Sequence, residues 1–436
     1  MNVLILGSGG REHALAWKIN QSHHCNQLYI APGNPGIAQI GQVVEIGVND
    51  FDAIKAFSIA NKIDVIVVGP EEPLVNGIYD FMEKAKTENG WKGFVVGPSK
   101  EAAQLEGSKA FSKKFMQRHG IPTAAYAEFT QENFDEGIAY IKQHTLPIVL
   151  KADGLAAGKG VVISETHDDA MKVFEEMIVN RQFGKASSKV VIEEFLKGIE
   201  VSVFVLTNGH DYQVIGHAKD YKRIGEGDTG LNTGGMGCVT PVPFMDDLFM
   251  QKVEERIIAP TINGLEKEGL VYNGFIFFGL MNVDGEPDVI EYNCRLGDPE
   301  TEVILPRLDT DLLSLFAAMD NGTLEDANIN FSDGYFATVV AVSGGYPGDY
   351  KKNIPIIGTE NKLPSNSLLF HAGTKDVNGQ IVTNGGRVLT VTTKEKSLGA
   401  AVSQSVSLLK EIQFEGINYR KDIGYEFDYK VARIQL

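Results

Sequence analysis

The sequence has few cysteines and no long apolar segment. Its 3 cysteines, Cys25, Cys238 and Cys294, lie far apart, so neither a disulfide framework nor the paired spacing of a zinc site is expected. No apolar stretch approaches the roughly 20 residues that a helix needs to span a bilayer. The opening MNVLILGSGG has neither the basic region nor the long apolar region of a secretory signal. We therefore expect a cytoplasmic protein without a membrane partner.

Positive charge is also scarce. The chain carries 40 Lys and Arg against 57 Asp and Glu, for a formal net charge of −17 at pH 7. An acidic surface repels the phosphate backbone of a nucleic acid, so no nucleic-acid partner is expected. Small phosphorylated ligands remain compatible with this charge, because a few basic side chains in one loop suffice to hold them.

The order of segments predicts more than one kind of domain. Up to about residue 100, apolar strands such as NVLILG and IDVIVVG alternate with helical segments, and each strand ends in Gly, Pro or Ser. This order is typical of a parallel α/β sheet whose loops bind ligands at the carboxyl ends of the strands. Further on, hairpins and helices are mixed, and the region after about residue 330 has short strands, turns and one helix.

The stretch PIVLKADGLAAGKGVVIS, residues 147–164, is rich in glycine and contains a Gly-Lys pair. It is not the common phosphate loop, because Asp153 stands at the first glycine position and Gly160 replaces the final Ser or Thr. Both flanks are short and apolar, which predicts a strand-loop-strand hairpin. The hairpin is either a flexible flap over a phosphate or a mobile surface hairpin with a solvated Lys159.

The turn GSGGREH follows the first predicted strand. Gly7 and Gly9 fit a dinucleotide fingerprint, but Glu12 takes the place of the third glycine, and the second strand lacks the acidic residue that reads ribose. A nicotinamide or flavin site is therefore not favoured. Two alternatives stay open: an anion bound at the helix N-terminus after Gly10, or a tight turn without a ligand.

The stretch VIEYNCRLGDPE carries the most informative pattern. Side chains alternate between the two faces of a strand. One face takes Glu291, Asn293 and Arg295. The other face takes Ile290, Tyr292 and Cys294. Carboxylate and amide oxygens are the ligands that Mg²⁺ prefers, and a guanidinium beside them can neutralise a phosphoryl group in transfer. The alternative is an exposed polar face with a surface ion pair.

Two further segments complete the candidate site. Glu193, Glu194, Phe195 and Leu196 link two predicted strands, where the backbone could bind adenine and Glu200 could hold ribose; a charged linker is the alternative. The loop KDYKRIGEGDTGLNTGGMG is too rich in glycine for a regular element, and a loop of this length is usually either functional or disordered.

Taken together, these stretches resemble the ATP-grasp ligases. The likeness is closest to the phosphoribosylamine–glycine ligase family, through VLILGSGGREHALAWK, APGNPG, VVGPEEPLVNGI, GPSKEAAQLEGSKAF, KADGLAAGKGV, DTGLNTGGMG, EYNCRLGDPET, HAGTK and NGGRVL. The resemblance implies an α/β and α+β fold: a parallel, Rossmann-like N-terminal domain at 1–105, a two-lobed ATP-grasp domain at 106–325 with its flap lobe at about 122–192, and a small α+β domain at 326–436.

The resemblance also implies a reaction. ATP phosphorylates glycine, and the amine of 5-phosphoribosylamine attacks the glycyl phosphate to give glycinamide ribonucleotide, ADP and phosphate, with Mg²⁺ or Mn²⁺ as cofactor and a monomeric enzyme. Three alternatives stay open. The chain could be another ATP-grasp ligase or carboxylase acting on a purine ribotide, a Rossmann oxidoreductase, or an ATP-binding module without turnover.

The family's functional residues transfer to matching positions of this sequence. The residues implied to bind ATP are Lys109, Lys151, Gly154, Gly158, Lys159, Gly160, Glu193, Glu194, Phe195, Leu196 and Glu200. Those implied to bind the other substrates are Gly9, Gly10, Arg11, Glu12, Glu71, Asp220, Lys222, Arg295 and Asp298. Glu291 and Asn293 would hold the metal, and Arg295 and Lys151 would be catalytic.

Overall fold

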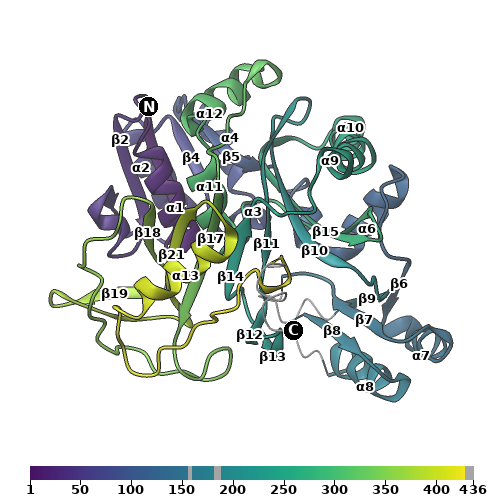
Figure 1. Ribbon diagram of the computed structural model, residues 1–436. Helices are drawn as coiled ribbons and strands as arrows, with labels where there is room; N and C mark the ends of the chain where they lie inside the picture. Colours follow the sequence, from purple (N-terminus) through teal and green to yellow (C-terminus); the bar gives the residue numbers. More distant parts are fainter. Residues whose placement is uncertain (156–159, 181–187, 428–436) are drawn as a thin grey trace.

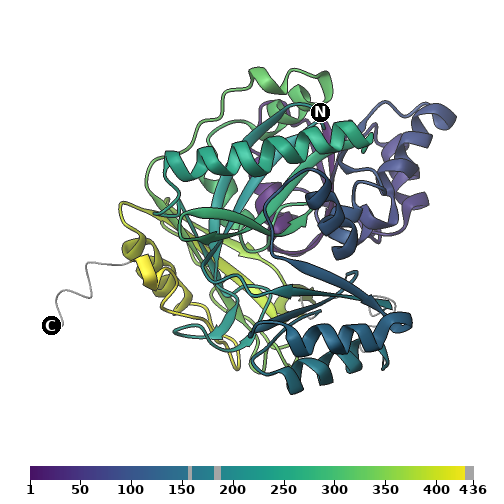
Figure 2. The same cartoon turned by 90° about the vertical axis from the view of Figure 1, so that its right-hand side faces the viewer.

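The structure is a computed structural model that describes residues 1–155, 160–180 and 188–427. Its main feature is one mixed sheet of 13 strands that runs through nearly the whole molecule (Figure 1). The strand order is β18-β21-β17-β14-β11-β10-β15-β5-β4-β1-β2-β3, and β16 pairs with β15 outside this row. A smaller lobe with its own sheet projects from this body (Figures 1 and 2).

The N-terminal part is the parallel α/β unit that the sequence predicts. Its strands are β1 (Asn2–Gly7), β2 (Gln27–Pro32), β3 (Gln42–Val43), β4 (Val65–Val68) and β5 (Phe94–Pro98). Its helices are α1 (Gly10–Ile19), α2 (Phe51–Ala60), α3 (Glu71–Asn76) and α4 (Ile78–Asn89). All pairings among these strands are parallel. The strand β4, VIVV, is fully buried, as expected for β-branched residues covered on both faces.

Two short helices, α5 (Gln104–Gly107) and α6 (Lys109–Arg118), lead into the lobe. The lobe consists of β6 (Tyr126–Thr130), α7 (Phe134–Gln143), β7 (Ile148–Ala152), β8 (Val161–Ser164), α8 (His167–Ile178) and β9 (Lys189–Glu194). Its four strands are antiparallel in the order β6-β9-β7-β8, so the predicted hairpin of β7 and β8 is confirmed.

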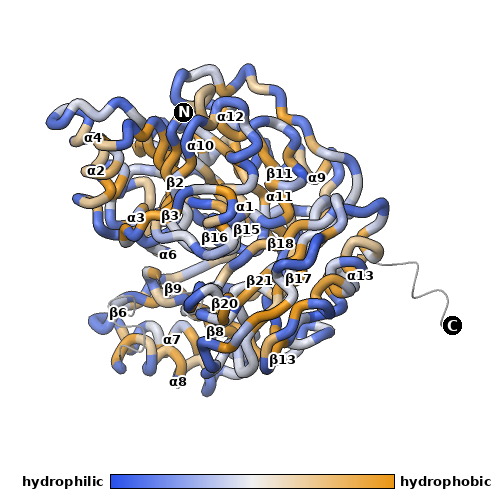
Figure 3. Tube along the Cα trace, turned by 90° about the vertical axis from the view of Figure 1, so that its left-hand side faces the viewer, coloured by the Kyte–Doolittle hydropathy of each residue, from blue (hydrophilic) through white to orange (hydrophobic). Residues whose placement is uncertain are grey.

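The lobe has a separate core because α7 and α8 present apolar faces to its sheet. In α8, buried Ala170, Phe174 and Ile178 recur every four residues, and the Thr166 side chain caps the helix by accepting from the Asp169 N–H. The Phe174 ring stacks on Phe134 at 5.2 Å between ring centroids. In Figure 3, orange and blue stretches alternate along α7 and α8, as expected for helices with one apolar face.

The body continues through the middle of the chain. Its strands there are β10 (Ile199–Thr207), β11 (Tyr212–Asp220), β14 (Gly237–Thr240), β15 (Tyr272–Val283) and β16 (Glu286–Asn293). A long helical segment comprises α9 (Asp247–Val253), a π-turn (Glu254–Ile258) and α10 (Ala259–Glu268), and α11 (Thr301–Arg307) and α12 (Leu312–Asn321) follow. The predicted turn between β15 and β16 is confirmed, with positive φ at Asp284 and Gly285.

The C-terminal part extends the same sheet. It comprises β17 (Tyr335–Val342), β18 (Ser367–His371), β19 (Thr374–Val377), β20 (Gln380–Thr383), β21 (Arg387–Glu395) and α13 (Leu398–Leu409). β17 pairs with β14, and β15 pairs with β5, so all three predicted domains contribute strands to one sheet. No helix in the described ranges is long and apolar enough to cross a membrane.

The glycine-rich loop at 219–237 differs from the prediction. It contains a small antiparallel hairpin of β12 (Arg223–Gly225) and β13 (Thr229–Asn232). Asp228 and Gly227 turn the chain with positive φ, and Asp228 accepts hydrogen bonds from buried Arg420 and from Tyr425. The prediction of no regular element was wrong because glycines supply the turn geometry while the C-terminal segment anchors the hairpin.

Candidate active site

Two adjoining cavities lie between the lobe and the body. The first, here the lobe-side cavity, measures about 360 Å³ and lies between β7, β8 and the link after β9 on one side and β16 on the other. The second, here the arginine cavity, measures about 500 Å³ and contains Arg11, Arg295 and Arg387. Glu291, Asn293 and Arg295 line both cavities. The face of β16 that the sequence singled out therefore forms their common wall.

The alternation predicted for β16 is confirmed at its end. Tyr292 and Cys294 are buried in the body core, opposite Glu291, Asn293 and Arg295. Ile290 was predicted on the same face as Tyr292 and Cys294, and this was wrong, because it lines the lobe-side cavity. The pairing of β15 with β16 shifts between Gly279 and Leu280, so Ile290 is the extra residue of a β-bulge and the alternation restarts there.

Glu291 lies within a group of lysines. Its Oε2 is 3.3 Å from the Nζ of Lys109, at the start of α6. Burial alone would raise the pKa of Glu291, but the ammonium groups of Lys109, Lys222 and Lys151 outweigh it and lower the pKa to about 2. The carboxylate is thus ionised at any working pH. The Asn293 amide nitrogen beside it is buried and has no partner among the described residues.

Lys151, at the end of β7, is buried rather than solvated. Its Nζ is 2.9 Å from Glu193 Oε2 and donates to the Ile290 carbonyl at 3.2 Å. Lys113 of α6 approaches the same Glu193 oxygen at 3.2 Å. The Glu193 side chain is therefore occupied with two lysines, which leaves its backbone and the following link to face the cavity.

The remaining walls of the lobe-side cavity are apolar on one side and charged on the other. The apolar wall contains Val149, Val161, Ile163, Phe195, Leu196, Phe277, Met281 and Ile290. The charged wall contains Glu200, Asp220 and Lys222. Lys222 pairs with Glu200 and lies 3.9 Å from Asp220. Burial raises the pKa of Asp220, with Lys222 opposing the shift. A flat apolar ligand with polar substituents suits such a cavity.

In the arginine cavity, every guanidinium has a carboxylate partner. Arg295 Nη2 is 3.0 Å from Glu106 Oε1, and Arg295 Nε is 3.5 Å from Glu71 Oε2. Arg387 Nη2 of β21 is 3.0 Å from Asp298 Oδ1. Burial would raise the pKa of Glu71, but Arg295 and Arg11 lower it overall. Guanidiniums held in this way present fixed donors to an anion.

The turn before α1 lies at the edge of this cavity. Glu12 is buried, its Oε2 accepts from the Gly9 N–H at 2.6 Å, and its Oε1 accepts from Arg11 Nε at 2.7 Å. A Cβ on Gly69 would lie 2.0 Å from Glu12 Oε1, so the glycine makes room for this side chain. Arg11 lines the arginine cavity, whereas Gly9, Gly10 and Glu12 line neither cavity.

The flap contributes in part. Gly154 and Gly160 line the arginine cavity from the ends of the β7-β8 hairpin. Gly158 and Lys159 lie outside the described residues. The Asp153 Oδ1 beside Gly154 accepts from the Ser108 hydroxyl at 2.9 Å, which ties the base of the hairpin to the start of α6.

Three charged residues of the site were missed by the sequence reasoning. Glu106 fixes Arg295 and accepts from the Cys294 N–H at 2.7 Å. Arg387 comes from the C-terminal part, and Glu300 lines the lobe-side cavity, where burial and the Asp220 charge raise its pKa to about 8. These residues stand in the stretches LEGSKAF, NGGRVL and GDPE, but nothing in the sequence of these stretches shows that their side chains lie close together in the fold.

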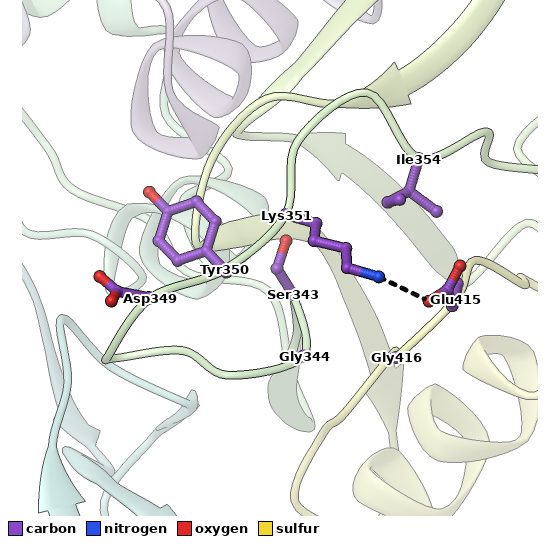
Figure 4. Close-up of a pocket in the computed structure, with 8 residues that line it drawn as sticks. All are labelled: Ser343, Gly344, Asp349, Tyr350, Lys351, Ile354, Glu415 and Gly416. Atoms are coloured by element: carbon purple, nitrogen blue, oxygen red, sulfur yellow. Dashed lines mark hydrogen bonds and ion pairs between the residues drawn. The ribbon is translucent and has the colours of Figure 1, made fainter.

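A further hollow of about 430 Å³ lies in the C-terminal part, away from these cavities (Figure 4). Lys351 and Glu415, which form an ion pair at 3.4 Å, line it together with Ser343, Gly344 and Gly416. None of the predicted site residues lines it. It is therefore not part of the candidate site.

Comparison with known proteins agrees with this architecture. Sequence models of phosphoribosylglycinamide synthetase match along the chain, with the N domain at residues 1–106, the ATP-grasp (A) domain at 107–301 and the C domain at 336–426. A phosphoribosylamine–glycine ligase of Pasteurella multocida (strain Pm70) is 45% identical over 428 residues, which cover 98% of each chain.

Solved structures give the same result. The crystal structure of phosphoribosylamine–glycine ligase from Thermotoga maritima is 35% identical, covers 97% of this chain and 100% of that chain, and has a TM-score of 0.82. The biotin carboxylase domain of Hydrogenobacter thermophilus 2-oxoglutarate carboxylase, solved with MgADP and bicarbonate, is 16% identical, covers 97% of this chain and 92% of that chain, and shares the fold at a TM-score of 0.70. The predicted fold class and family are thus confirmed. The chain belongs to the phosphoribosylglycinamide synthetase family.

Proposed function

We propose that this protein is an ADP-forming ligase of purine biosynthesis that joins glycine to 5-phosphoribosylamine. The observation that carries the proposal is the common wall of the two cavities. A nucleotide in the lobe-side cavity and a phosphorylated amine in the arginine cavity would meet at Glu291, Asn293 and Arg295. The family membership of the chain supports the choice of these substrates.

The chemistry needs an activation step. A carboxylate is a poor acyl donor, because its leaving group would be an oxide. Transfer of the γ-phosphoryl group of ATP to a glycine carboxylate oxygen gives glycyl phosphate and ADP. The amine of phosphoribosylamine then attacks the acyl carbon, phosphate leaves, and a proton is lost from the nitrogen. The intermediate hydrolyses in water, so the site must close during the reaction.

In this proposal the lobe-side cavity holds ATP. The apolar wall with Phe195 and Leu196 packs on adenine, the link from Glu193 to Leu196 offers backbone hydrogen bonds, and Glu200 reaches the ribose hydroxyls. Lys109 and Lys151 face the phosphates. Gly154 to Gly160 would cover them, with Lys159 as a further cation. No nucleophilic side chain is required, because phosphoryl transfer depends on positioning and on positive charge.

Glu291 and Asn293 fit a divalent cation. An ionised carboxylate and an amide side chain on one strand face supply two hard oxygen ligands, and substrate phosphates would complete the shell. We propose Mg²⁺ as the usual ion, with Mn²⁺ as a substitute. When bound, the ion would neutralise charge on the nucleotide phosphates. Arg295 lies on the same face and would stabilise the phosphoryl group as it moves.

The arginine cavity suits phosphoribosylamine. Arg11, Arg295 and Arg387 converge on it from three parts of the chain and can bind the ribose phosphate. Glu71 and Asp298 offer oxygens to hydroxyls and to the amine. Gly9, Gly10 and Glu12, in the turn before α1, would contribute to phosphoribosylamine binding at this end of the site. Asp220 and Lys222 would act where the two substrates meet.

The same proposal includes the organisation of the chain. Residues 1–105 would form the substrate domain, 106–325 the ATP-grasp domain with its flap lobe at about 122–192, and 326–436 the C-terminal domain. We propose a cytoplasmic monomer. The body sheet ends in the short strand β3 and in β18, and edge strands of this kind can pair with a second copy of the chain. Sedimentation of the full chain tests whether it is a monomer.

ADP release tests the proposed reaction. Release should require both glycine and freshly prepared 5-phosphoribosylamine, and alanine should support it poorly. Glycinamide ribonucleotide should appear in equal amount with ADP. Equal turnover with bicarbonate in place of glycine would instead assign the protein to a carboxylating relative.

A further inference from the structure

Lys113 is a buried lysine that the proposed reaction does not use. It lies on α6 behind the lobe-side cavity, is only 2% exposed, and lines neither cavity. Its Nζ donates to the Thr123 hydroxyl at 2.7 Å and to the Ala124 carbonyl at 3.3 Å, and lies 3.2 Å from Glu193 Oε2. A buried ammonium without a carboxylate partner would be costly, so Glu193 accounts for its presence.

Glu193 serves two lysines through one oxygen. Lys151 Nζ, which lines the cavity, lies 2.9 Å from the same Oε2 atom. The other carboxylate oxygen, Oε1, has no hydrogen-bond partner among the described residues. Two ammonium groups and one carboxylate therefore form a charged triad that runs from the interior to the cavity, with Lys113 at the inner end and Lys151 at the outer end.

The net charge of this triad depends on the protonation of Lys113. With both lysines protonated, the three groups carry a net charge of +1 at the cavity wall. With Lys113 neutral, Glu193 and Lys151 cancel each other, and Glu193 holds Lys151 more strongly. Lys151 then has less positive charge to offer to an anion in the cavity.

We propose that Lys113 is a positioning residue for the nucleotide: its ammonium group balances Glu193 from behind, so that Lys151 stays available to the phosphates. This rests on the proposed function only in taking a nucleotide as the ligand of the lobe-side cavity. Direct binding of ADP tests it without glycine or phosphoribosylamine, so a failure of ligase turnover and a failure of this inference are distinguishable.

The surroundings of Lys113 make its charge sensitive to pH. Burial and the positive charge of Lys151 lower its pKa to about 8, although the carboxylate of Glu193 opposes this shift. The other groups that face it are Glu194, Asp288 and the ring of Tyr126, whose centroid is 5.5 Å from the ammonium nitrogen. Nucleotide affinity should therefore fall as the pH rises through about 8.

The experiment is calorimetric titration of the full chain with ADP at constant Mg²⁺ from pH 7.5 to 9.5, above the range in which phosphate binds a proton. The affinity of the wild-type protein for ADP should fall by about tenfold across this range. Lys113→Arg should bind tightly with a flat profile, because a guanidinium stays charged. Lys113→Met should bind about tenfold more weakly at pH 7.5 and show no further loss. Lys114→Met, at the exposed neighbouring position, should follow wild type.

Three results would overturn the inference. These are a flat wild-type profile, an alkaline loss that persists in Lys113→Arg, and wild-type affinity in Lys113→Met. The first needs no variant, so it decides even if a substitution prevents folding. Melting temperatures at each pH show whether a variant is folded where it is measured.

Discussion

The two sides of the cleft are built differently. The lobe that borders the lobe-side cavity has its own four-stranded sheet and its own core around Phe174. The charged wall of the arginine cavity comes from the body, where strands of the N-terminal, middle and C-terminal parts pair in one sheet. Among the residues that the structure describes, the lobe adds to that cavity only members of the β7-β8 hairpin, such as Gly154 and Gly160.

The difference separates two tasks. A lobe with a separate core can move as a unit over a ligand, whereas arginines held by one sheet keep a fixed geometry. The charges agree with this division. Lys151 and Lys222 line only the lobe-side cavity, and the paired guanidiniums of Arg11 and Arg387 line only the arginine cavity. Arg295 lines both cavities, and Lys109 lines the arginine cavity. Substitutions on each side should therefore have separable effects.

The largest effect is expected from Phe174→Ala in the lobe core. Loss of a buried ring should destabilise the lobe by about 3 to 5 kcal/mol. Because that core is separate, hydrogen exchange should accelerate in β7 and β9 and stay slow in β10 and β15. Phe278→Ala in the body core is the matched control and should accelerate exchange in β10 and β15. Equal acceleration in β10 would show that lobe and body unfold together.

Glu291→Gln tests the common wall. It removes the charge that pairs with Lys109 and would bind the metal, so kcat should fall by roughly 100- to 1,000-fold, equivalent to about 3 to 4 kcal/mol. ADP should still bind, more weakly, and added Mg²⁺ should restore part of the rate. Glu286→Gln, at the exposed start of the same strand, should leave turnover near wild type. Normal turnover of Glu291→Gln at low Mg²⁺ would remove this residue from the site.

Arg387→Gln tests the arginine side alone. One charge-assisted contact to the substrate phosphate should be lost, worth about 1.5 to 3 kcal/mol, so the KM for phosphoribosylamine should rise by roughly 10- to 100-fold. The KM for ATP should change little. Lys394→Gln, further along the same strand, provides the control. A matching rise in both KM values would contradict the separation of the two sides.

The smallest effect concerns the junction of α1 with β18 in the body. Burial lowers the pKa of His13 to about 3 and that of His371 to about 4, and His13 Nδ1 accepts from the His371 N–H at 2.8 Å. Both side chains are neutral in the folded state, while the unfolded chain takes up protons below about pH 6.5. The free energy of unfolding therefore falls as the pH drops below 6.5.

Each histidine contributes about 1.4 kcal/mol per pH unit to that fall. His13→Gln should thus reduce the loss between pH 7.5 and 5.5 by about 1.4 kcal/mol, measured by urea unfolding at each pH. At each pH, the His13→Gln substitution should leave the hydrogen exchange rates within the lobe unchanged. An unchanged loss would mean that His13 is not a source of the acid sensitivity.

Local patterns in the sequence predicted much of this molecule. Alternation along β16 placed Glu291, Asn293 and Arg295 together, and glycine flanked by apolar strands predicted the hairpin of the lobe. Both signals are short-range. The bulge at Ile290 escaped prediction because it depends on the register against β15, which no local pattern reveals.

The missed site residues have the same explanation. Glu106 and Arg387 stand in unremarkable surroundings in the sequence, and they become part of the site only because α5 and β21 pack beside β16 and the turn after it. Likewise, Lys113 looks like any charged residue of a helix until β9 brings Glu193 against it. Residue type and spacing can be read locally, whereas a partner from a distant strand cannot.

The continuity of the body sheet has a consequence for synthesis of the chain. The strand β5 is complete at Pro98, yet its second neighbour, β15, begins at Tyr272. Similarly, β14 can pair with β17 only after the C-terminal part has emerged from the ribosome. A nascent chain therefore exposes unpaired strand edges for much of its translation, and such edges can pair with other chains. The lobe, whose four strands lie between these partners in the sequence, can close its own sheet in the meantime.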